Sequence, residues 1–317
     1  MTSVTGRCVR TILAVSTVCA VFAGCAGERT LTVEALRDQA SARVLETNSD
    51  GVAGLTLDTV RGSIVLLKGT ELTQYVALSG DGAINTIDNL YLGAKKVDEL
   101  PLQQLFDARA SAERECKDLG TDDGFATLEV APAGALLLTR LCPGSSGAHV
   151  LGQTLDGHLV PRLGEVDSAE ALAKVLAEFI VTHGGKAAAI RIDYGPSPRG
   201  QVLPSITVLG DLVGVSGTAC RAALSHQTFD LAHVQVAQEG GGLALACERP
   251  GAIPVEEAFD VAEVSPERLA AALTQVYQRV PRDSIQHVDI LRDSQGIAIV
   301  VNPEGAGGTW NLDGTRR

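Results

Sequence analysis

Residues 116–142 read CKDLGTDDGFATLEVAPAGALLLTRLC, and this stretch decides how the chain is expected to fold. It begins where an amphipathic pattern ends, continues through alternating apolar residues at 125–130, and closes on a run of leucines before a second cysteine. A helix with one apolar stripe, followed by strands with one apolar face, is typical of a two-layer α+β unit. The stretch therefore predicts a helix packed on an antiparallel β-meander.

A second segment, residues 220–247, resembles the first. Its cysteines are 27 positions apart, against 26 in the first segment, and residues 231–237 (LAHVQVA) align with residues 125–131 (FATLEVA). Both segments then run through glycine and leucine to the closing cysteine. Self-similarity of this kind indicates tandem structural units.

The number of cysteines favours disulfide bonds in an exported chain. Of seven cysteines, Cys8 and Cys19 lie in an N-terminal apolar segment and Cys25 follows it, so four remain for pairing. Four cysteines allow three connectivities, and the absence of a C-x-x-C motif or a nearby ligand histidine argues against zinc. In the chain-entropy model each bridge would contribute about 3 to 4 kcal/mol. The repeat favours the pairs Cys116–Cys142 and Cys220–Cys247.

Periodicity along the rest of the chain predicts more helices and strands. Apolar residues at helical spacing predict helices at 33–44, 102–116, 172–180 and 265–280, with a shorter one around Cys220. Alternating residues predict strands at 55–58, 64–68, 126–130, 188–193, 205–209, 234–237 and 288–291. Asp-Gly pairs at 81–82, 156–157 and 313–314 are typical of hairpin turns, and without a D-x-D-x-D series we favour turns over calcium sites.

The expected fold class is thus α+β, with tandem two-layer units that each pack a helix on an antiparallel meander. The second and fourth units contain the paired cysteines, and in the third a proline- and glycine-rich loop at 195–200 interrupts the meander. The five predicted units span 32–97, 98–164, 165–212, 213–262 and 263–317.

The first 24 residues have the composition of a secretory signal. Arg7 and Arg10 precede an uncharged run at 11–23, and Ala23-Gly24 supplies the small residues that precede a cleavage site. As a helix this run would rise only about 20 Å, too little for a bilayer core of roughly 30 Å. We expect residues 1–24 to be a removable signal peptide.

Phe22-Ala23-Gly24-Cys25 resembles the lipobox of bacterial lipoproteins. The resemblance implies a diacylglycerol thioether on Cys25, which would become the first mature residue, with residues 25–31 as a short tether. Two acyl chains such as palmitate hold a protein stably at a membrane, so the expected location is the extracytoplasmic face of the cell membrane. An ordinary secretory signal with an incidental cysteine is the alternative.

The body of the chain loosely resembles the PepSY domains and the β-lactamase inhibitor proteins. The likeness is in the order of elements, helix and then meander in tandem, and no shared motif accompanies it. It implies binding of a protein or peptide on a sheet face, and a likeness in fold alone does not establish function.

Charge and motifs exclude several other classes of function. The formal net charge is −12, and it becomes −14 once Arg7 and Arg10 are removed with the signal. Such a chain lacks the clustered basic residues that nucleic-acid binding needs. The residues at 184–187 (GGKA) end a predicted helix instead of opening one, so they form no phosphate loop. We expect no cofactor, no metal and no nucleic-acid partner.

Three hypotheses of function remain from the sequence. The first is a non-enzymatic envelope lipoprotein that binds a protein or peptide partner, and the second is a lipid or glycolipid carrier. The third is an envelope hydrolase that uses His149 or His158, although no G-x-S-x-G motif is present. The remaining histidines, at 183, 226, 233 and 287, form no paired-ligand spacing and are expected to be surface or hydrogen-bonded residues.

Overall fold

The computed structural model confirms an α+β fold built from helices and antiparallel meanders. It describes residues 31–58, 62–78, 84–87, 89–121, 123–144, 147–195, 204–215, 217–227, 242–249, 257–303 and 307–317. The predicted signal peptide, Cys25 and most of the predicted tether lie outside these ranges. Within the described ranges, no helix has both the length and the apolar character required to cross a membrane.

The N-terminal half contains two helices and one eight-stranded sheet with the strand order β4-β3-β2-β1-β5-β6-β7-β8. Its elements are α1 (Val33–Thr47), β1 (Gly51–Leu57), β2 (Gly62–Lys68), β3 (Glu71–Tyr75), β4 (Ile84–Ile87), the short 3₁₀ helix η1 (Val97–Glu99), α2 (Leu102–Asp118), β5 (Phe125–Val130), β6 (Leu136–Gly144), β7 (Gly147–Leu155) and β8 (His158–Leu159).

The C-terminal half repeats this plan with a seven-stranded sheet of order β13-β12-β11-β10-β15-β16-β17 and a small β14-β9 pair. Its elements are α3 (Ala169–His183), β9 (Lys186–Ala187), β10 (Ala189–Asp193), β11 (Ser205–Val215), β12 (Thr218–Gln227), β13 (Leu243–Glu248), β14 (Phe259–Asp260), η2 (Val261–Glu263), α4 (Pro266–Tyr277), η3 (Arg282–Ser284), β15 (Ile285–Asp293), β16 (Gly296–Pro303) and β17 (Gly308–Asn311).

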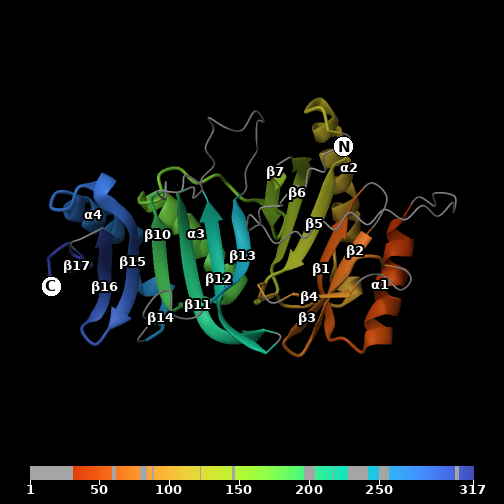
Figure 1. The fold of residues 1–317 in the computed structure, drawn as a ribbon, viewed down its shortest axis with the longest axis horizontal. Helices are drawn as coiled ribbons and strands as arrows, with labels where there is room; N and C mark the ends of the chain where they lie inside the picture. The colour runs from red at the N-terminus through yellow and green to blue at the C-terminus, as the bar shows by residue number, and fades with distance from the viewer. Residues whose placement is uncertain are drawn as a thin grey trace, which may run out of the picture.

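In each half, two meanders are joined along their first strands. Strand β1 pairs antiparallel with β5 in the first sheet, and β10 pairs antiparallel with β15 in the second. Figure 1 shows the two sheets next to each other along the long axis, with α1 at one end of the molecule and the C-terminus at the other. The described chain is therefore two paired helix-and-meander assemblies in tandem.

This topology corrects the predicted division into five units. The boundary expected between 212 and 213 falls inside β11, and one meander runs from β10 to β13 through both predicted units. The helix expected around Cys220 is also wrong, because Cys220 lies in β12 and pairs with Val213 of β11. The aligned residues 231–237 lie outside the described residues, as does the predicted strand at 234–237.

The other predicted helices are present, and their caps follow from the sequence. Ser168 accepts a hydrogen bond from the Ala171 amide at the start of α3, and Ser265 does the same for Arg268 before α4. Gly184 ends α3 in the left-handed conformation, with φ of 83°. Asp156 and Gly157 both have positive φ, 48° and 80°, as the predicted hairpin turn between β7 and β8 requires.

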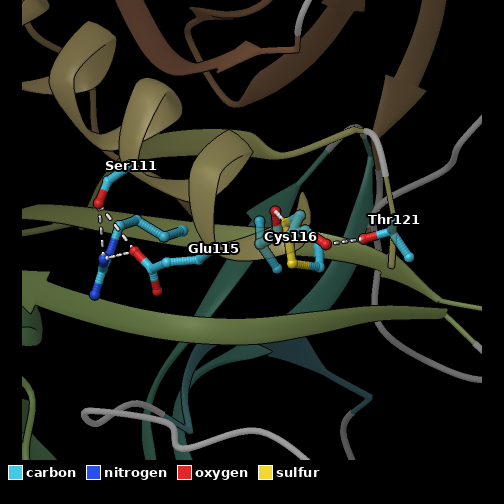
Figure 2. The surroundings of a disulfide bond; sticks show 7 residues. Ser111, Glu115, Cys116 and Thr121 are labelled. Atoms are coloured by element: carbon cyan, nitrogen blue, oxygen red, sulfur yellow. Dashed lines mark hydrogen bonds and ion pairs between the residues drawn. A yellow bond between two sulfur atoms is a disulfide. The ribbon is translucent and has the colours of Figure 1, made fainter. Parts of the chain in front are cut away.

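Both disulfides are present with the pairing that the repeat predicts. Cys116 of α2 is bonded to Cys142 of β6, with their Cα atoms 5.6 Å apart. Around this bridge, Thr121 donates a hydrogen bond to the Cys116 carbonyl (3.1 Å), and Glu115 pairs with Arg140 of β6 (Figure 2). Cys220 is bonded to Cys247 of β13, with a Cα separation of 5.4 Å. The first bridge thus joins a helix to the sheet, whereas the second joins two neighbouring strands.

The two halves are joined through buried polar contacts. The side chain of Gln153 on β7 donates to the Leu243 carbonyl of β13 (2.8 Å) and accepts from the Leu243 amide (2.9 Å). The amide of Cys247 donates to the carbonyl of Asn89 (3.0 Å). Apolar residues of both halves form one buried cluster here, among them Leu137, Leu155, Leu243 and Leu245. We call this region the joint.

Candidate functional site

The face of the C-terminal sheet that points away from α3 and α4 is the candidate site. Ile190 and Ile192 on β10 belong to the core that these helices cover. Because side chains alternate along a strand, Ala189, Arg191 and Asp193 lie on the opposite face. Figure 1 shows both helices behind this sheet. We call the opposite surface the open face.

A row of polar side chains crosses the open face in register. Ser225, Thr207, Arg191 and Asp289 are paired neighbours on β12, β11, β10 and β15. Arg191 donates two hydrogen bonds to Asp289, from Nε to Oδ1 (2.7 Å) and from Nη2 to Oδ2 (3.1 Å). The Thr207 hydroxyl donates to Ser225 Oγ (3.1 Å). The two-point arginine–carboxylate geometry fixes both side chains in place.

A row of alanine and leucine side chains runs alongside the polar row. Its members are paired across neighbouring strands and form a buried cluster of their own, and they are Ala223, Leu209, Ala189 and Leu291, with Ala246 packed against them. The open face therefore combines a largely buried apolar row with oriented polar groups, of which Arg191, Thr207 and Ser225 are partly exposed. Apolar area beside oriented polar groups is the composition of protein-binding surfaces.

The pKa values of the charged residues on the open face are shifted by burial and by their contacts with each other. Burial lowers the pKa of Arg191, but the hydrogen bonds and the charge of Asp289 outweigh it, so the net shift is upward. Burial raises the pKa of Asp193, although Arg191 acts in the other direction. His287 Nε2 lies 3.7 Å from Asp289 Oδ2. Arg191 thus lies between the carboxylates of Asp289 and Asp193, and these fixed charges can orient a polar ligand.

Ser205 and His287, a possible nucleophile and a possible base on the open face, are not neighbours. Ser205 and His287 both lie opposite Asp193, on the two strands that flank β10. Two strand spacings separate them by roughly 10 Å, far beyond hydrogen-bonding reach.

The equivalent face of the N-terminal sheet is not open in the same way. Thr127, Thr139 and Gln153 are buried there, and Gln153 forms the hydrogen bonds to Leu243 described above. Leu137 and Leu155 lie in the cluster shared with the second half. The N-terminal sheet therefore uses this face to build the joint.

The histidines considered in the sequence are dispersed. His149 on β7 and His158 on β8 are exposed, and neither borders the polar recess of the C-terminal sheet described below. His226 is fully buried on the helix side, where its Nδ1 lies 2.7 Å from Glu178 of α3. His233 lies outside the described residues.

Cys25, the predicted lipidation site, also lies outside the described residues, while Cys116, Cys142, Cys220 and Cys247 are all in disulfides. Among the residues that the structure describes, no group of three or more histidine, cysteine, aspartate or glutamate side chains could hold a metal ion.

The residues of the open face were not found by sequence reasoning. Alternation predicted the strand at 188–193, which is β10, and Arg191 and Asp193 are the polar residues of that alternation. It could not have shown that Arg191 pairs with Asp289, because that partner lies 98 residues further along the chain.

Comparison with known proteins does not assign the chain to a family. No family model and no curated protein matches the chain. Among solved structures, the PCNA2–PCNA3 complex from Sulfolobus tokodaii aligns with 11% identity and a TM-score of 0.14, covering 86% of this chain and 93% of that one. Proliferating cellular nuclear antigen from Entamoeba histolytica aligns with 10% identity and a TM-score of 0.14, covering 84% and 89%. These scores are too low to support any inference about fold or function.

Proposed function

We propose that the protein is a lipoprotein of the bacterial cell envelope, anchored through Cys25, which binds a protein or peptide partner on its open face. The observation that carries the binding part is the pair of registered rows on the C-terminal sheet, one polar and one apolar. The lipobox-like residues 22–25 and the two disulfides, which persist in oxidising compartments, support the location.

Membrane fractionation tests the anchor. The Cys25→Ser variant should leave the membrane fraction and lose incorporation of labelled palmitate. Cys19→Ala, which changes a cysteine of the segment that processing removes, is the matched control and should behave as the unmodified protein. Retention of Cys25→Ser in the membrane fraction would contradict the anchor, and equal release of both variants would point to a general defect in export.

Site-specific photo-crosslinking tests the open face. A photoreactive amino acid at Thr207 lies in the middle of the polar row, whereas one at Thr274 lies exposed on α4, on the other side of the sheet. We expect one protein or peptide adduct from the Thr207 site that is absent from the Thr274 site. The adduct should also decrease when Ser225→Arg adds a bulky charge beside the crosslinker. Identical adducts from both positions would exclude the open face as the binding surface.

A further inference from the structure

A polar recess lies at the β17 edge of the C-terminal sheet, beyond the last residue named in the polar row. It has a volume of about 480 Å³ and is lined by the turn between β15 and β16, by β17 and by the residues that follow it, namely Asp293, Ser294, Gln295, Gly308, Thr309, Arg316 and Arg317. The C-terminus lies at the opposite end of the molecule from α1 (Figure 1). A volume of this size accommodates a small polar ligand.

Two charged residues of the recess are already paired with each other. Arg317 donates to Asp293, to the Asn311 side chain (2.7 Å) and to the Ile297 carbonyl (3.1 Å). The other oxygen of Asp293 accepts from the Gln295 amide (2.8 Å). The Arg317 hydrogen bond holds the pKa of Asp293 below its usual range. Asp293 therefore stays ionised and neutralises Arg317.

Arg316 is the charged residue of the recess that takes no part in the Arg317–Asp293 pair. Its backbone is held by a β-bridge to Trp310, and the next residue donates its amide to the Thr309 carbonyl (2.8 Å). Among the residues that the structure describes, none accepts a hydrogen bond or forms an ion pair with the exposed Arg316 side chain. The recess thus has one uncompensated positive charge in a chain whose formal net charge is −12.

Uncharged donors line the same recess. The hydroxyls of Ser294 and Thr309 and the amide of Gln295 line the recess, and within the described chain these side chains have no hydrogen-bond partner of their own. A guanidinium presents its N–H groups as a planar fork that matches the oxygens of carboxylates and phosphates. Hydroxyl and amide donors can complete the coordination of such a group.

We infer that the recess binds a small oxyanion, a carboxylate or phosphate group, with Arg316 as its principal ligand-binding residue. Asp293 and Arg317 position the turn and the C-terminal residues around it. This site lies beyond the end of the polar row, which continues in register from Asp289 through Val300 to Thr309. None of the four residues named in the polar row lines the recess, so the two kinds of binding can be tested with different variants.

The single tryptophan of the chain gives a direct readout. Trp310 is adjacent to Thr309 and is bridged to Arg316, so its fluorescence should report on the recess. Purified protein in neutral detergent is titrated with inorganic phosphate and, separately, with acetate, while chloride holds the ionic strength constant. Calorimetry follows the same titrations, so that binding without a fluorescence change is also detected.

We expect saturable binding of at least one of the two anions, and their relative affinities identify the ligand as a phosphate or a carboxylate. Arg316→Gln should weaken binding at least tenfold, because it removes charge-assisted hydrogen bonds. Ser294→Ala should weaken it about fivefold. Arg279→Gln, an exposed arginine after α4, should leave affinity unchanged. Absence of saturable binding by both methods, or equal affinity in Arg316→Gln, would overturn the inference.

Discussion

Glu129 on β5 is a carboxyl group in an unfavourable environment. It lies between Gly54 of β1 and Leu137 of β6, on the side of the sheet that forms the joint. Burial raises its pKa from 4.5 to about 7. Ionisation of Glu129 is therefore disfavoured in the folded protein. The free energy of unfolding decreases as the pH rises from 4.5 through 7, because the unfolded chain loses this proton first.

Glu129→Gln should remove this dependence of stability on pH. The amide has almost the shape of the protonated acid, so the variant should match the unmodified protein at pH 4.5 and exceed its stability at pH 8 by up to about 3 kcal/mol. Urea denaturation at both pH values measures the difference. Equal stability at pH 8 would show that Glu129 ionises freely in the fold.

His183, at the end of α3, has the opposite pH dependence. Its ring stacks on Phe179 with a centroid distance of 4.8 Å, and its Nε2 is buried without a hydrogen-bond partner among the described residues. Burial lowers the pKa of His183 from 6.5 to about 4. The folded state therefore keeps the ring neutral, and stability present above pH 6.5 is lost as the pH falls towards 4.

His183→Phe should make the C-terminal half more resistant to acid. Phenylalanine preserves the stack and cannot take up a proton, so the loss of up to about 3 kcal/mol between pH 6.5 and 4 should be absent. Thr182 keeps its hydrogen bond to the Glu178 carbonyl (2.7 Å) in this variant. Thermal unfolding followed across this pH range checks the expectation, and parallel acid sensitivity in both proteins would contradict it.

Among the elements, the disulfides allow a direct comparison. Both close loops of nearly equal length, with sequence separations of 26 and 27. If each disulfide stabilises mainly by restricting the unfolded chain, replacing either cysteine pair by serine should lower the free energy of unfolding by about 3 to 4 kcal/mol. Urea denaturation of the two double variants measures this, after non-reducing peptide mapping has verified the bridges in the unmodified protein. A much smaller cost for one pair would show that native-state effects dominate that bridge.

Helices were predictable from the sequence because their signals are local. Pro101, Ser168 and the Ser265-Pro266 pair mark helix starts within one or two residues of the elements that they begin. The segment around Cys220 was misread because its alanines and leucine favour a helix in isolation, whereas pairing with β11 and β13 places it in a strand. Long-range pairing overrides local preference there.

The candidate site was less predictable than the fold. Alternation reveals that Arg191 and Asp193 share a face of a strand, but not which face the helices leave uncovered. That depends on the packing of α3 and α4, which are separated from each other by a whole meander. The recess around Arg316 was equally hidden, because β17 and the turn at 293–295 come together only in the folded sheet.

At the scale of the whole molecule, Gln153 is the residue on which the joint depends. Its side chain satisfies both backbone groups of Leu243 and also donates to Thr139 (3.1 Å). Gln153→Leu should leave these buried groups without hydrogen bonds and should lower the free energy of unfolding by about 2 to 4 kcal/mol. Hydrogen exchange at β13 should accelerate as well. Gln74→Leu, in β3 of the same sheet, is the matched control and should change neither quantity.

The position of the second disulfide has a mechanical consequence. Strand β13 is the outermost strand of its sheet, and both backbone contacts of the joint, at Leu243 and Cys247, lie on it. A load pulling the halves apart would act on this strand first and would tend to peel it from β12 one hydrogen bond at a time. The Cys220–Cys247 bridge ties the two strands covalently. Peeling that starts at Leu243 can therefore proceed only as far as Cys247, and tension across the molecule cannot separate β13 from β12 beyond the bridge.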